Sequence, residues 1–270
     1  MPPTKRMVHF VRKSGLERHR VLLKYAQTTL WAFDYFKSLI KFKADKRKYK
    51  AMNTRKEFNI NEFKLFPLLD DWNSSAGALS TYFYQDLWAA KKIHSSGVKN
   101  HFDIGSRVDG FILSLLAFTK VTLIDIRRLE INVDGLEFLQ ADATNLENIP
   151  DGSIMSLSAL CSLEHFGLGR YGDPVDPEAC FKAFKAIQRV IGGGGKVYIS
   201  VPIAKNNSLE FNAHRIFSPE TIIKEFNQME LCEFTVVKHD GRLISNALED
   251  ISWHIDSMYD DFGLFEFKKK

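Results

Sequence analysis

Three side chains that could move a proton follow two apolar segments of the chain. Glu164 and His165 come soon after residues 154–159, and His214 comes after residues 196–201. An unperturbed histidine has a pKa of about 6.5, so it can accept a proton from a hydroxyl group near neutral pH. We predict a catalytic base here, with His165 the first candidate, His214 the second and Glu164 a weaker one. The alternative of hydrogen-bonded, purely structural histidines stays open.

A second group of residues has the order of a ligand-binding turn. Asp103 and Gly105 end one apolar segment, and Asp125 ends the next, 20 residues after Gly105. A glycine lets a ligand approach the backbone, and the first N–H groups of a following helix are free donors. An acid at this distance can bind a ribose diol. Parallel sheets bind ligands beyond the carboxyl ends of their strands, so we predict a site there.

The glycines do not complete a dinucleotide-binding pattern. In G-x-G-x-x-G, Gly105 would be the first glycine and Gly110 the third, but Arg107 stands at the second. The segment instead resembles the first motif of class I S-adenosylmethionine-dependent methyltransferases, D-x-G-x-G-x-G. Asp103 and Gly105 match this motif directly, Arg107 replaces its second glycine, and Gly110 comes one residue after the position of its third.

Other segments extend the resemblance over about residues 98–268. They are I-P-D-G-S at 149–153, L-E-H at 163–165, and R-V-I-G-G-G-G-K-V-Y-I-S-V-P at 189–202. The resemblance implies a methyltransferase, a transferase that uses S-adenosyl-L-methionine and releases S-adenosyl-L-homocysteine. It also implies an α/β fold: a Rossmann-like, seven-stranded, mostly parallel sheet with helices on both faces and an antiparallel last strand.

The same resemblance implies the residues that bind the cofactor. An acid after the third strand contacts the adenine amino group in this family, and Asp142 has that place, with Ala143 beside it. Asp is also common in turns and caps, so a structural role for Asp142 stays open. Arg107 could bind the donor carboxylate, point outward or obstruct the pocket. The implied set is Asp103, Gly105, Ser106, Arg107, Asp125, Ile126, Asp142, Ala143 and Leu160.

Residues 167–177 form a glycine- and proline-rich segment, GLGRYGDPVDP, which favours a loop able to cover a site. We predict that Arg170 and Tyr171 in this loop bind a phosphate or sugar of the substrate, with Asp173 beside them. The sequence contains no H-E-x-x-H or clustered D-x-D pattern, so we predict no metal.

A narrower resemblance concerns the acceptor. Three sequence segments, YFYQDLWAAKKI, HFDIGSRVDGFI and VTLIDIR, resemble those of a bacterial family of methyltransferase-like proteins. Members of that family are associated with surface-polysaccharide biosynthesis. The resemblance implies a small or lipid-linked glycan precursor, methylated on a hydroxyl of a sugar or sugar-linked group. Two alternatives remain: a catalytically degenerate methyltransferase fold acting as a binding or scaffold protein, and a Rossmann NAD-dependent oxidoreductase.

Composition favours a soluble α/β domain with an appendage. Of 270 residues, 45% are hydrophobic and 26% charged, and no apolar run is long enough for a bilayer. The basic amino-terminal stretch lacks the apolar region of a signal peptide. The three cysteines are odd in number and widely spaced, which favours a reducing, cytoplasmic setting.

The positive charge is concentrated near the amino terminus. Residues 1–57 hold 16 Lys and Arg against 4 Asp and Glu, and the rest holds 21 against 29. We predict a basic helical extension, residues 1–73, before a methyltransferase-like domain, residues 74–270. Apolar spacing predicts helix over 14–50. It could pack on the domain with a solvated basic face, or contact the membrane's inner face peripherally. No signature supports nucleic-acid binding.

Apolar periodicity gives the remaining elements. We expect four helices: residues 74–94, a helix that begins at residue 110, residues 178–190 and residues 219–226. Gly192–Gly195 follows the third of these as a signal that ends the helix. Residues 126–135 should hold at most one helical turn, and 205–217 should be a loop. The predicted strands are 102–104, 121–124, 136–139, 154–159, 196–201, 233–238 and 263–268.

Overall fold

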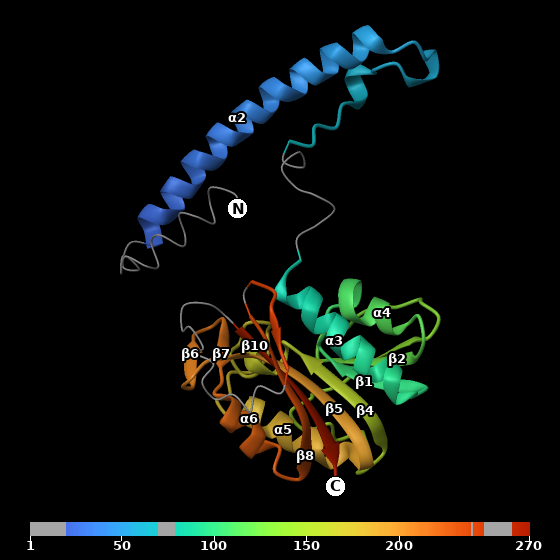
Figure 1. The fold of residues 1–270 in the computed structure, drawn as a ribbon, viewed down its shortest axis with the longest axis vertical. Helices are drawn as coiled ribbons and strands as arrows, with labels where there is room; N and C mark the ends of the chain where they lie inside the picture. Colours follow the sequence, from blue (N-terminus) through green and yellow to red (C-terminus); the bar gives the residue numbers. More distant parts are fainter. Residues whose placement is uncertain (1–19, 70–78, 239, 246–260) are drawn as a thin grey trace. The chain divides into compact units, whose positions relative to one another are not determined.

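The structure is a computed structural model that describes residues 20–69, 79–238, 240–245 and 261–270, with the side chains of 20–33 excepted. The chain divides into two compact units, Met1–Ala78 and Leu79–Lys270, which we describe separately (Figure 1). Within the described residues, no helix is long and apolar enough to cross a membrane.

The amino-terminal unit is built around one long helix, α2 (Arg20–Met52). Residues 14–19, where a helix was also predicted, lie outside the described residues. Two short 3-10 turns follow, η2 (Lys56–Phe58) and η3 (Glu62–Lys64). The Lys46 ammonium lies 2.8 Å from the Glu62 carboxylate. This ion pair ties the segment after the helix back to the helix.

The second unit is centred on an eight-stranded sheet with the strand order β3-β2-β1-β4-β5-β10-β8-β9. The pairings from β3 to β5 are parallel, and β10 runs antiparallel to both of its neighbours. The seven predicted strands are present, and β9 is an additional short strand. The strands are β1 (Asn100–Ile104), β2 (Lys120–Asp125), β3 (Leu136–Gln140), β4 (Ile154–Leu160), β5 (Ile191–Ile203), β8 (Met229–Val237), β9 (Leu243–Ile244) and β10 (Asp261–Lys269).

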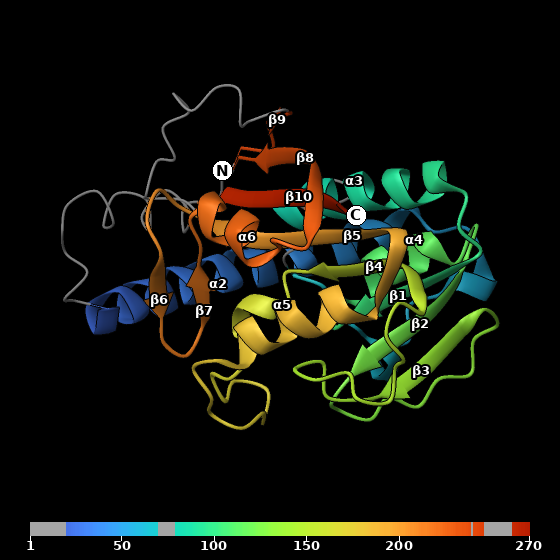
Figure 2. The same ribbon diagram turned by 90° about the horizontal axis from the view of Figure 1, so that it is seen from below.

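Helices cover both faces of the sheet, as predicted (Figure 2). One face packs against α3 (Thr81–Ser96), the π turn η5 (Val108–Ile112) and the single-turn α4 (Leu113–Leu115), around buried residues such as Trp88 and Phe111. The other packs against α5 (Ala179–Val190) and α6 (Pro219–Glu225), around Phe184 and Phe226. Buried apolar clusters on both faces pack the sheet between two helical layers.

Register brings the carboxyl ends of the central strands to one edge. Ile104 of β1 pairs with Ile124 of β2, and Asp125 pairs with Gln140 of β3. On the other side, Leu160 of β4 pairs with Ser200 of β5. The loops that leave β1, β2, β3 and β4 therefore start beside one another, which is the arrangement that a shared site requires.

Two helices differ in extent from the sequence expectation. α3 begins at Thr81 rather than residue 74, and residues 74–78 lie outside the described residues. The helix expected from Gly110 is only the π turn and three α-helical residues, because the chain turns again before β2. The connection 126–135 has no helix, in agreement with the prediction.

The glycine run has a different role from the predicted one. β5 begins at Ile191, directly after α5, and contains Gly192–Gly195 within the strand. A Cβ at Gly192 would lie 2.6 Å from the Gly152 carbonyl oxygen, and one at Gly195 would lie 2.9 Å from that of Gly192. The glycines therefore permit close backbone approach at the start of the strand, where pairing with β4 is irregular.

The segment predicted as a loop at 205–217 contains a small hairpin. β6 (Ser208–Glu210) and β7 (His214–Ile216) pair antiparallel. α6 follows as predicted: Pro219 is in its first turn, and the Ser218 hydroxyl accepts a hydrogen bond from the Thr221 N–H (3.3 Å). The hairpin places His214 on a strand rather than on a loop.

Candidate ligand-binding and catalytic site

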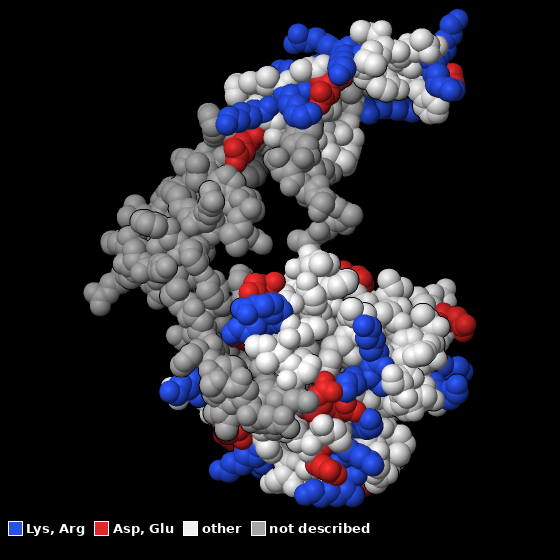
Figure 3. Space-filling model, viewed as in Figure 1, with Lys and Arg blue, Asp and Glu red and all other residues white. Residues whose placement is uncertain are grey.

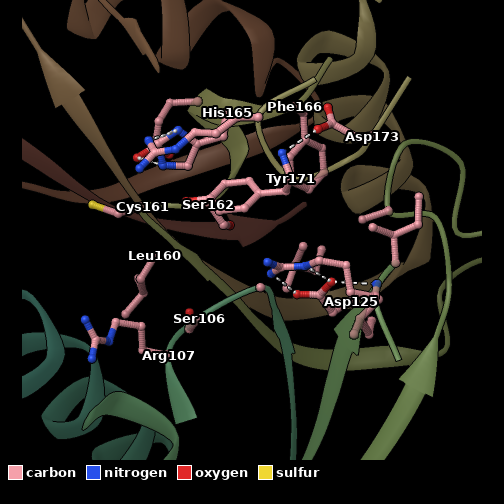
Figure 4. A pocket seen from close by; sticks show the side chains of 18 of the residues that line it. Ser106, Arg107, Asp125, Leu160, Cys161, Ser162, His165, Phe166, Tyr171 and Asp173 are labelled. Carbon is pink, nitrogen blue, oxygen red and sulfur yellow. Dashed lines mark hydrogen bonds and ion pairs between the residues drawn. The ribbon is translucent and has the colours of Figure 1, made fainter. Parts of the chain in front are cut away.

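A cavity of about 1480 Å³ opens at the carboxyl edge of the sheet. Of the residues predicted to form a site, Asp103 alone is absent from its wall. Those that line it are Gly105, Ser106, Arg107, Asp125, Ile126, Asp142, Ala143, Leu160, Glu164, His165, Arg170, Tyr171, Asp173 and His214. Residues distant in the chain thus share one hollow, part of which Figure 4 shows.

Asp103 lies fully buried behind the turn that follows β1. Its carboxylate accepts hydrogen bonds from the Ser106 N–H (2.9 Å), the Ser106 hydroxyl (2.8 Å) and the Ser158 hydroxyl. Burial raises its pKa to about 6, against the effect of these hydrogen bonds. Direct cofactor contact was predicted for Asp103, but the carboxylate instead holds the turn in place from the protein side.

The turn after β1 requires glycine at position 105 but not at position 107. Gly105 has φ +70°, and a Cβ there would lie 3.2 Å from the Ser162 Cβ. Arg107, where the motif usually has glycine, has φ −72° and ψ 132°, which any residue can adopt. Its exposed guanidinium makes a bidentate pair with Asp109, at 3.0 and 2.7 Å. Arg107 therefore occupies the cavity rim without backbone strain.

Asp86 on α3 is a site residue that sequence reasoning missed. Its carboxylate lines the cavity, and a Cβ at Gly110 would lie 2.9 Å from its Oδ2. Burial raises its pKa, while the Gln85 side-chain N–H, at 3.1 Å, and the charge of Arg107 act in the opposite direction. The signal in the sequence was a single acid within the aromatic stretch of residues 82–90.

The carboxylate of Asp125 accepts hydrogen bonds from Arg127, a residue that the sequence analysis did not predict to be part of the site. The Arg127 backbone N–H and Nε donate to Oδ1 (2.8 and 3.0 Å), and Nη2 donates to Oδ2 (2.7 Å), as Figure 4 shows for Asp125. Burial raises the pKa of Asp125, but these hydrogen bonds outweigh it and the pKa is lowered. Asp125 is therefore an ionised acceptor at the end of β2.

The predicted proton-transfer residues lie together. Glu164 and His165 are on the short 3-10 turn η6 (Leu163–His165), and Glu164 Oε1 lies 3.6 Å from His165 Nε2. The two imidazole rings of His165 and His214 are 6.2 Å apart. Within the described residues, three buried side-chain atoms of the cavity wall have no hydrogen-bond partner: Ser162 Oγ, Glu164 Oε2 and His214 Nε2.

The protonation of His165 follows from its neighbour. Its Nδ1 lies 2.7 Å from the Ala213 carbonyl oxygen, which can only accept, so Nδ1 carries the proton and Nε2 is free to accept one. Burial lowers the pKa of His165 to about 4, whereas burial raises the pKa of Glu164 to about 8. At neutral pH both side chains are therefore uncharged.

Backbone geometry around these residues is fixed by α3 and the hairpin. Cys161 turns the chain after β4 with φ 49°, and its thiol donates to the side-chain Oε1 of Gln85 (2.8 Å), which also accepts from the Ser200 hydroxyl (2.6 Å). The β6–β7 hairpin supplies the Ala213 carbonyl that orients His165. The turn η6 is thereby held between two distant segments.

Residues of the loop 167–177 line this part of the cavity. Arg170 Nη1 donates to the Ala213 carbonyl (2.9 Å), and the Tyr171 ring centroid lies 5.5 Å from that of His165. Asp173 accepts from the backbone N–H groups of Gly167 (2.7 Å) and Tyr171 (3.2 Å). Asp173 thus shapes the loop that presents Arg170 and Tyr171.

The remaining predicted residues also line the cavity. Asp142 accepts a hydrogen bond from the Thr144 N–H (2.8 Å), a turn interaction that leaves Oδ2 available. Ala143 and Leu160 are buried, and Ile126 is exposed. In the described part of the chain, no group of three or more His, Cys, Asp or Glu is placed to hold a metal ion.

Solved structures with this arrangement identify the fold. The crystal structure of the [4+2]-cyclase SpnF aligns with 68% of this chain and 79% of its own, at 15% identity and a TM-score of 0.51. That of a Burkholderia thailandensis 1,6-didemethyltoxoflavin-N1-methyltransferase, holding its substrate and S-adenosylhomocysteine, aligns with 74% and 81%, at 14% identity and a TM-score of 0.50. The chain thus has the Rossmann-like fold of class I methyltransferases.

Sequence comparisons are less informative. The family model described as "Caenorhabditis protein of unknown function, DUF268" matches residues 143–236, which run from the cavity wall after β3 to the end of β8. No curated protein matches the sequence. The family resemblance drawn from the motifs therefore agrees with the fold, while the polysaccharide-associated family remains a prediction.

Proposed function

We propose that the protein is an S-adenosyl-L-methionine-dependent methyltransferase acting on a hydroxyl of a sugar or sugar-linked group. One observation carries the proposal. Ser162, Glu164 and His214, each of which has a buried side-chain atom without a hydrogen-bond partner, line the same cavity as the Gly105 turn and Asp125. Buried polar groups without partners are costly, so these atoms point to a ligand that supplies the missing hydrogen bonds.

The residues present suit this donor. Asp125 would accept from the ribose hydroxyls, Asp142 would bind the adenine amino group, and the backbone after Gly105 would approach the sulfonium side. Asp86 and Arg107, both on the wall near the turn, offer one negative and one positive charge for an amino-acid zwitterion. The methyltransferase with this fold that was crystallised with S-adenosylhomocysteine supports the assignment.

Side chains of the protein would remove the proton from the acceptor hydroxyl. The donor supplies a methyl group on a positively charged sulfur. Beside it, the unprotonated Nε2 of His165 would take the proton of the attacking hydroxyl, and the Ala213 carbonyl keeps that nitrogen free. Glu164, 3.6 Å away, would stabilise the resulting imidazolium when ionised. Positioning by the loop 167–177 would supply the rest.

Calorimetric titration with S-adenosylhomocysteine tests the cofactor, with NAD as the control. We expect binding to wild type, a loss of at least ten-fold in affinity in Asp125→Ala, and no binding of NAD. Failure of S-adenosylhomocysteine to bind would favour a degenerate scaffold protein. NAD binding in its place would favour a Rossmann oxidoreductase.

The glycan acceptor rests on the narrower sequence resemblance. Transfer of a radiolabelled methyl group to sugar nucleotides and lipid-linked saccharides, against amino acids and catechols, tests it. Labelling of the saccharides that is lost in His165→Gln would support the proposal, and labelling confined to the other acceptors would contradict it.

We also propose that the amino-terminal unit contacts an anionic membrane surface, which would place the protein at the cytoplasmic face. Residues 34–69 hold ten Lys and Arg against four Asp and Glu, and Lys and Arg gather on this unit in Figure 3. Phe58, Phe63 and Phe66 are 62%, 99% and 82% exposed. Exposed aromatic side chains among basic ones suit the lipid headgroup region.

A further inference from the structure

Two arginines lie over one tyrosine in the acceptor half of the cavity. The guanidinium carbons of Arg127 and Arg170 are 4.7 and 5.1 Å from the Tyr171 ring centroid. The tyrosine in turn packs edge-on against His165. Arg170 thus lies beside the residue that would take the acceptor proton, and Arg127 lies over the tyrosine that packs against that residue, although the two arginines come from different loops.

The guanidinium of Arg170 has N–H donors that make no hydrogen bond within the described residues. Its Nη1 donates to the Ala213 carbonyl and lies 3.3 Å from His165 Nδ1. Within the described residues, its Nε and Nη2 have no hydrogen-bond partner, and no carboxylate lies within 4.0 Å of it. Asp173, the nearest acid of the same loop, has both oxygens engaged by backbone N–H groups.

Arg127, in contrast, directs two of its five side-chain N–H donors at Asp125. A carboxylate has about four acceptor sites, two on each oxygen. The Arg127 backbone N–H and Nε take both sites of Oδ1, and Nη2 takes one of Oδ2. A ribose diol needs two acceptor sites, and at most one is free. At least one hydrogen bond must therefore break before the diol can bind to this carboxylate, and two of those present come from the Arg127 side chain.

We propose that binding of the donor's ribose to Asp125 releases the Arg127 guanidinium, which then binds, together with Arg170, an anionic group on the acceptor. The inference rests on the proposed function of the site and adds to it a class of acceptor and an order of binding. The acceptor carries a phosphate or carboxylate close to the hydroxyl that is methylated. Its anion-binding site is complete only after the donor has bound.

The chemistry of the two side chains favours an oxyanion. A guanidinium presents paired N–H donors that match phosphate and carboxylate oxygens, and such charge-assisted pairs are stronger than neutral hydrogen bonds. Tyr171 packs under both cations and so limits their rotation. The two guanidinium groups together offer two positive charges to an anion, whereas a neutral sugar would use neither charge, so an anionic acceptor is the better match.

Nuclear magnetic resonance of the arginine side chains tests this directly. Full-length protein labelled with 15N would be titrated with inorganic phosphate or acetate, with and without S-adenosylhomocysteine, and with sodium chloride to match ionic strength. Arg127→Gln and Arg170→Gln assign the two Nε–H signals. Arg242→Gln, which removes an exposed arginine outside the cavity wall, is the matched control.

We expect S-adenosylhomocysteine alone to shift the Arg127 signal. Phosphate or acetate should then shift both signals with a half-saturation at least ten-fold lower than without it, and either glutamine variant should abolish this, unlike Arg242→Gln. The better of the two anions identifies the acceptor's charged group. If S-adenosylhomocysteine binds but leaves Arg127 unchanged, or if anions act equally without it, the inference is wrong. No binding of S-adenosylhomocysteine would instead refute the proposed function.

Discussion

At the scale of residues, the pKa values of Glu164 and His165 are shifted in opposite directions, which the residue types alone did not predict. Histidine was expected to titrate near neutral pH, but burial lowers its pKa to about 4. The neighbouring glutamic acid, which was the weaker candidate, has a pKa raised to about 8 by burial. The group that changes charge in the physiological range is therefore the carboxyl.

This pair gives a first prediction, about rate. The value of kcat/KM should rise with pH through an apparent pKa near 8, because ionised Glu164 stabilises the proton taken by His165. In Glu164→Gln the rise should disappear and the rate at pH 9 should fall at least ten-fold. Steady-state methyl-transfer assays from pH 6 to 9 measure both. A wild-type profile flat over this range would contradict the assignment.

A second prediction concerns stability. The folded pKa of Glu164 lies above that of an unfolded glutamic acid, so the folded state retains a proton that the unfolded state has lost between about pH 4.5 and 8. The free energy of unfolding therefore falls as pH rises through this window. Glu164→Gln should remove this pH-dependent loss. Its free energy of unfolding, relative to that of the wild type, should therefore be higher at pH 8.5 than at pH 5 by on the order of 2–4 kcal/mol.

Urea unfolding at both pH values checks this gain. Glu147→Gln, which changes an exposed carboxyl, is the control and should show no such difference. An equal effect of Glu164→Gln at the two pH values would mean that Glu164 is already ionised at pH 5.

All but one of the predicted site residues line the cavity, because the order of residues in the chain fixes which of them follow each strand. Residue types in order were not enough for residues whose role depends on side-chain contacts. Arg107 was thought able to obstruct the pocket, but its φ of −72° and its pair with Asp109 could not be known from the motif. The position of Asp86 beside the turn at Gly110, and that of Arg127 over Tyr171, depend on tertiary structure that no sequence motif specifies.

At the scale of elements, the turn after β1 depends on a network that lies behind it. Asp103 accepts from Ser106 and Ser158, and the Ser158 hydroxyl also lies 2.8 Å from His101 Nε2. Burial lowers the pKa of that histidine to about 3, so it is neutral. The network connects β1 to β4 and fixes the backbone that faces the cavity.

We therefore predict that Asp103→Ala acts on the site from a distance. Leaving three buried donors without an acceptor should lower the free energy of unfolding by about 2–4 kcal/mol. The affinity for S-adenosylhomocysteine should fall at least ten-fold, although Asp103 does not line the cavity. Asp103→Asn, which keeps one acceptor oxygen, should lose less of both. Urea unfolding and calorimetry measure these effects, and unchanged affinity in a folded Asp103→Ala protein would exclude this positioning role.

The loop 167–177 gives a prediction with a matched control. Gly167 has φ +75°, and a Cβ there would lie 1.9 Å from the Asp176 carbonyl oxygen. Gly172 has φ +82° but no atom within 4 Å of an added Cβ. Gly167→Ala should cost about 2–4 kcal/mol of unfolding free energy, and Gly172→Ala about 1 kcal/mol. Similar losses in urea unfolding would show that the loop can open without penalty at Gly167.

The elements themselves were predicted where their signals are local. Buried parallel strands have continuous apolar runs, and α5 and α6 have clear periodicity and caps. The exceptions are set by tertiary contacts. Gly192–Gly195 has the form of a helix stop, yet close packing against Gly152 makes it part of β5. The strands of the β6–β7 hairpin have three residues each, exposed in β6 and half-buried in β7, so neither has an alternating apolar pattern.

At the scale of the whole molecule, the two units have different surfaces and should be separable in function. We predict that full-length protein sediments with vesicles containing phosphatidylserine and not with phosphatidylcholine alone. Phe63→Ser combined with Phe66→Ser should reduce the bound fraction several-fold, because both side chains are exposed in the basic unit. Leu113→Ser, at an exposed apolar residue of the other unit, should have no effect. Equal pelleting of all three proteins would contradict membrane contact through this unit.

The strand order of the sheet also has a consequence for how the protein is made. β10 lies between β5 and β8, although it follows both in the chain, and within the described residues β8 pairs only with β10 and β9. During synthesis from the amino terminus, β8 is therefore made before either of its partners. Until residues 261–269 have left the ribosome, β5 and β8 both present open edges, which are sites for aggregation. A premature stop codon anywhere between β8 and β10 would make that exposure permanent, even though every residue of the cavity wall up to His214 had been made.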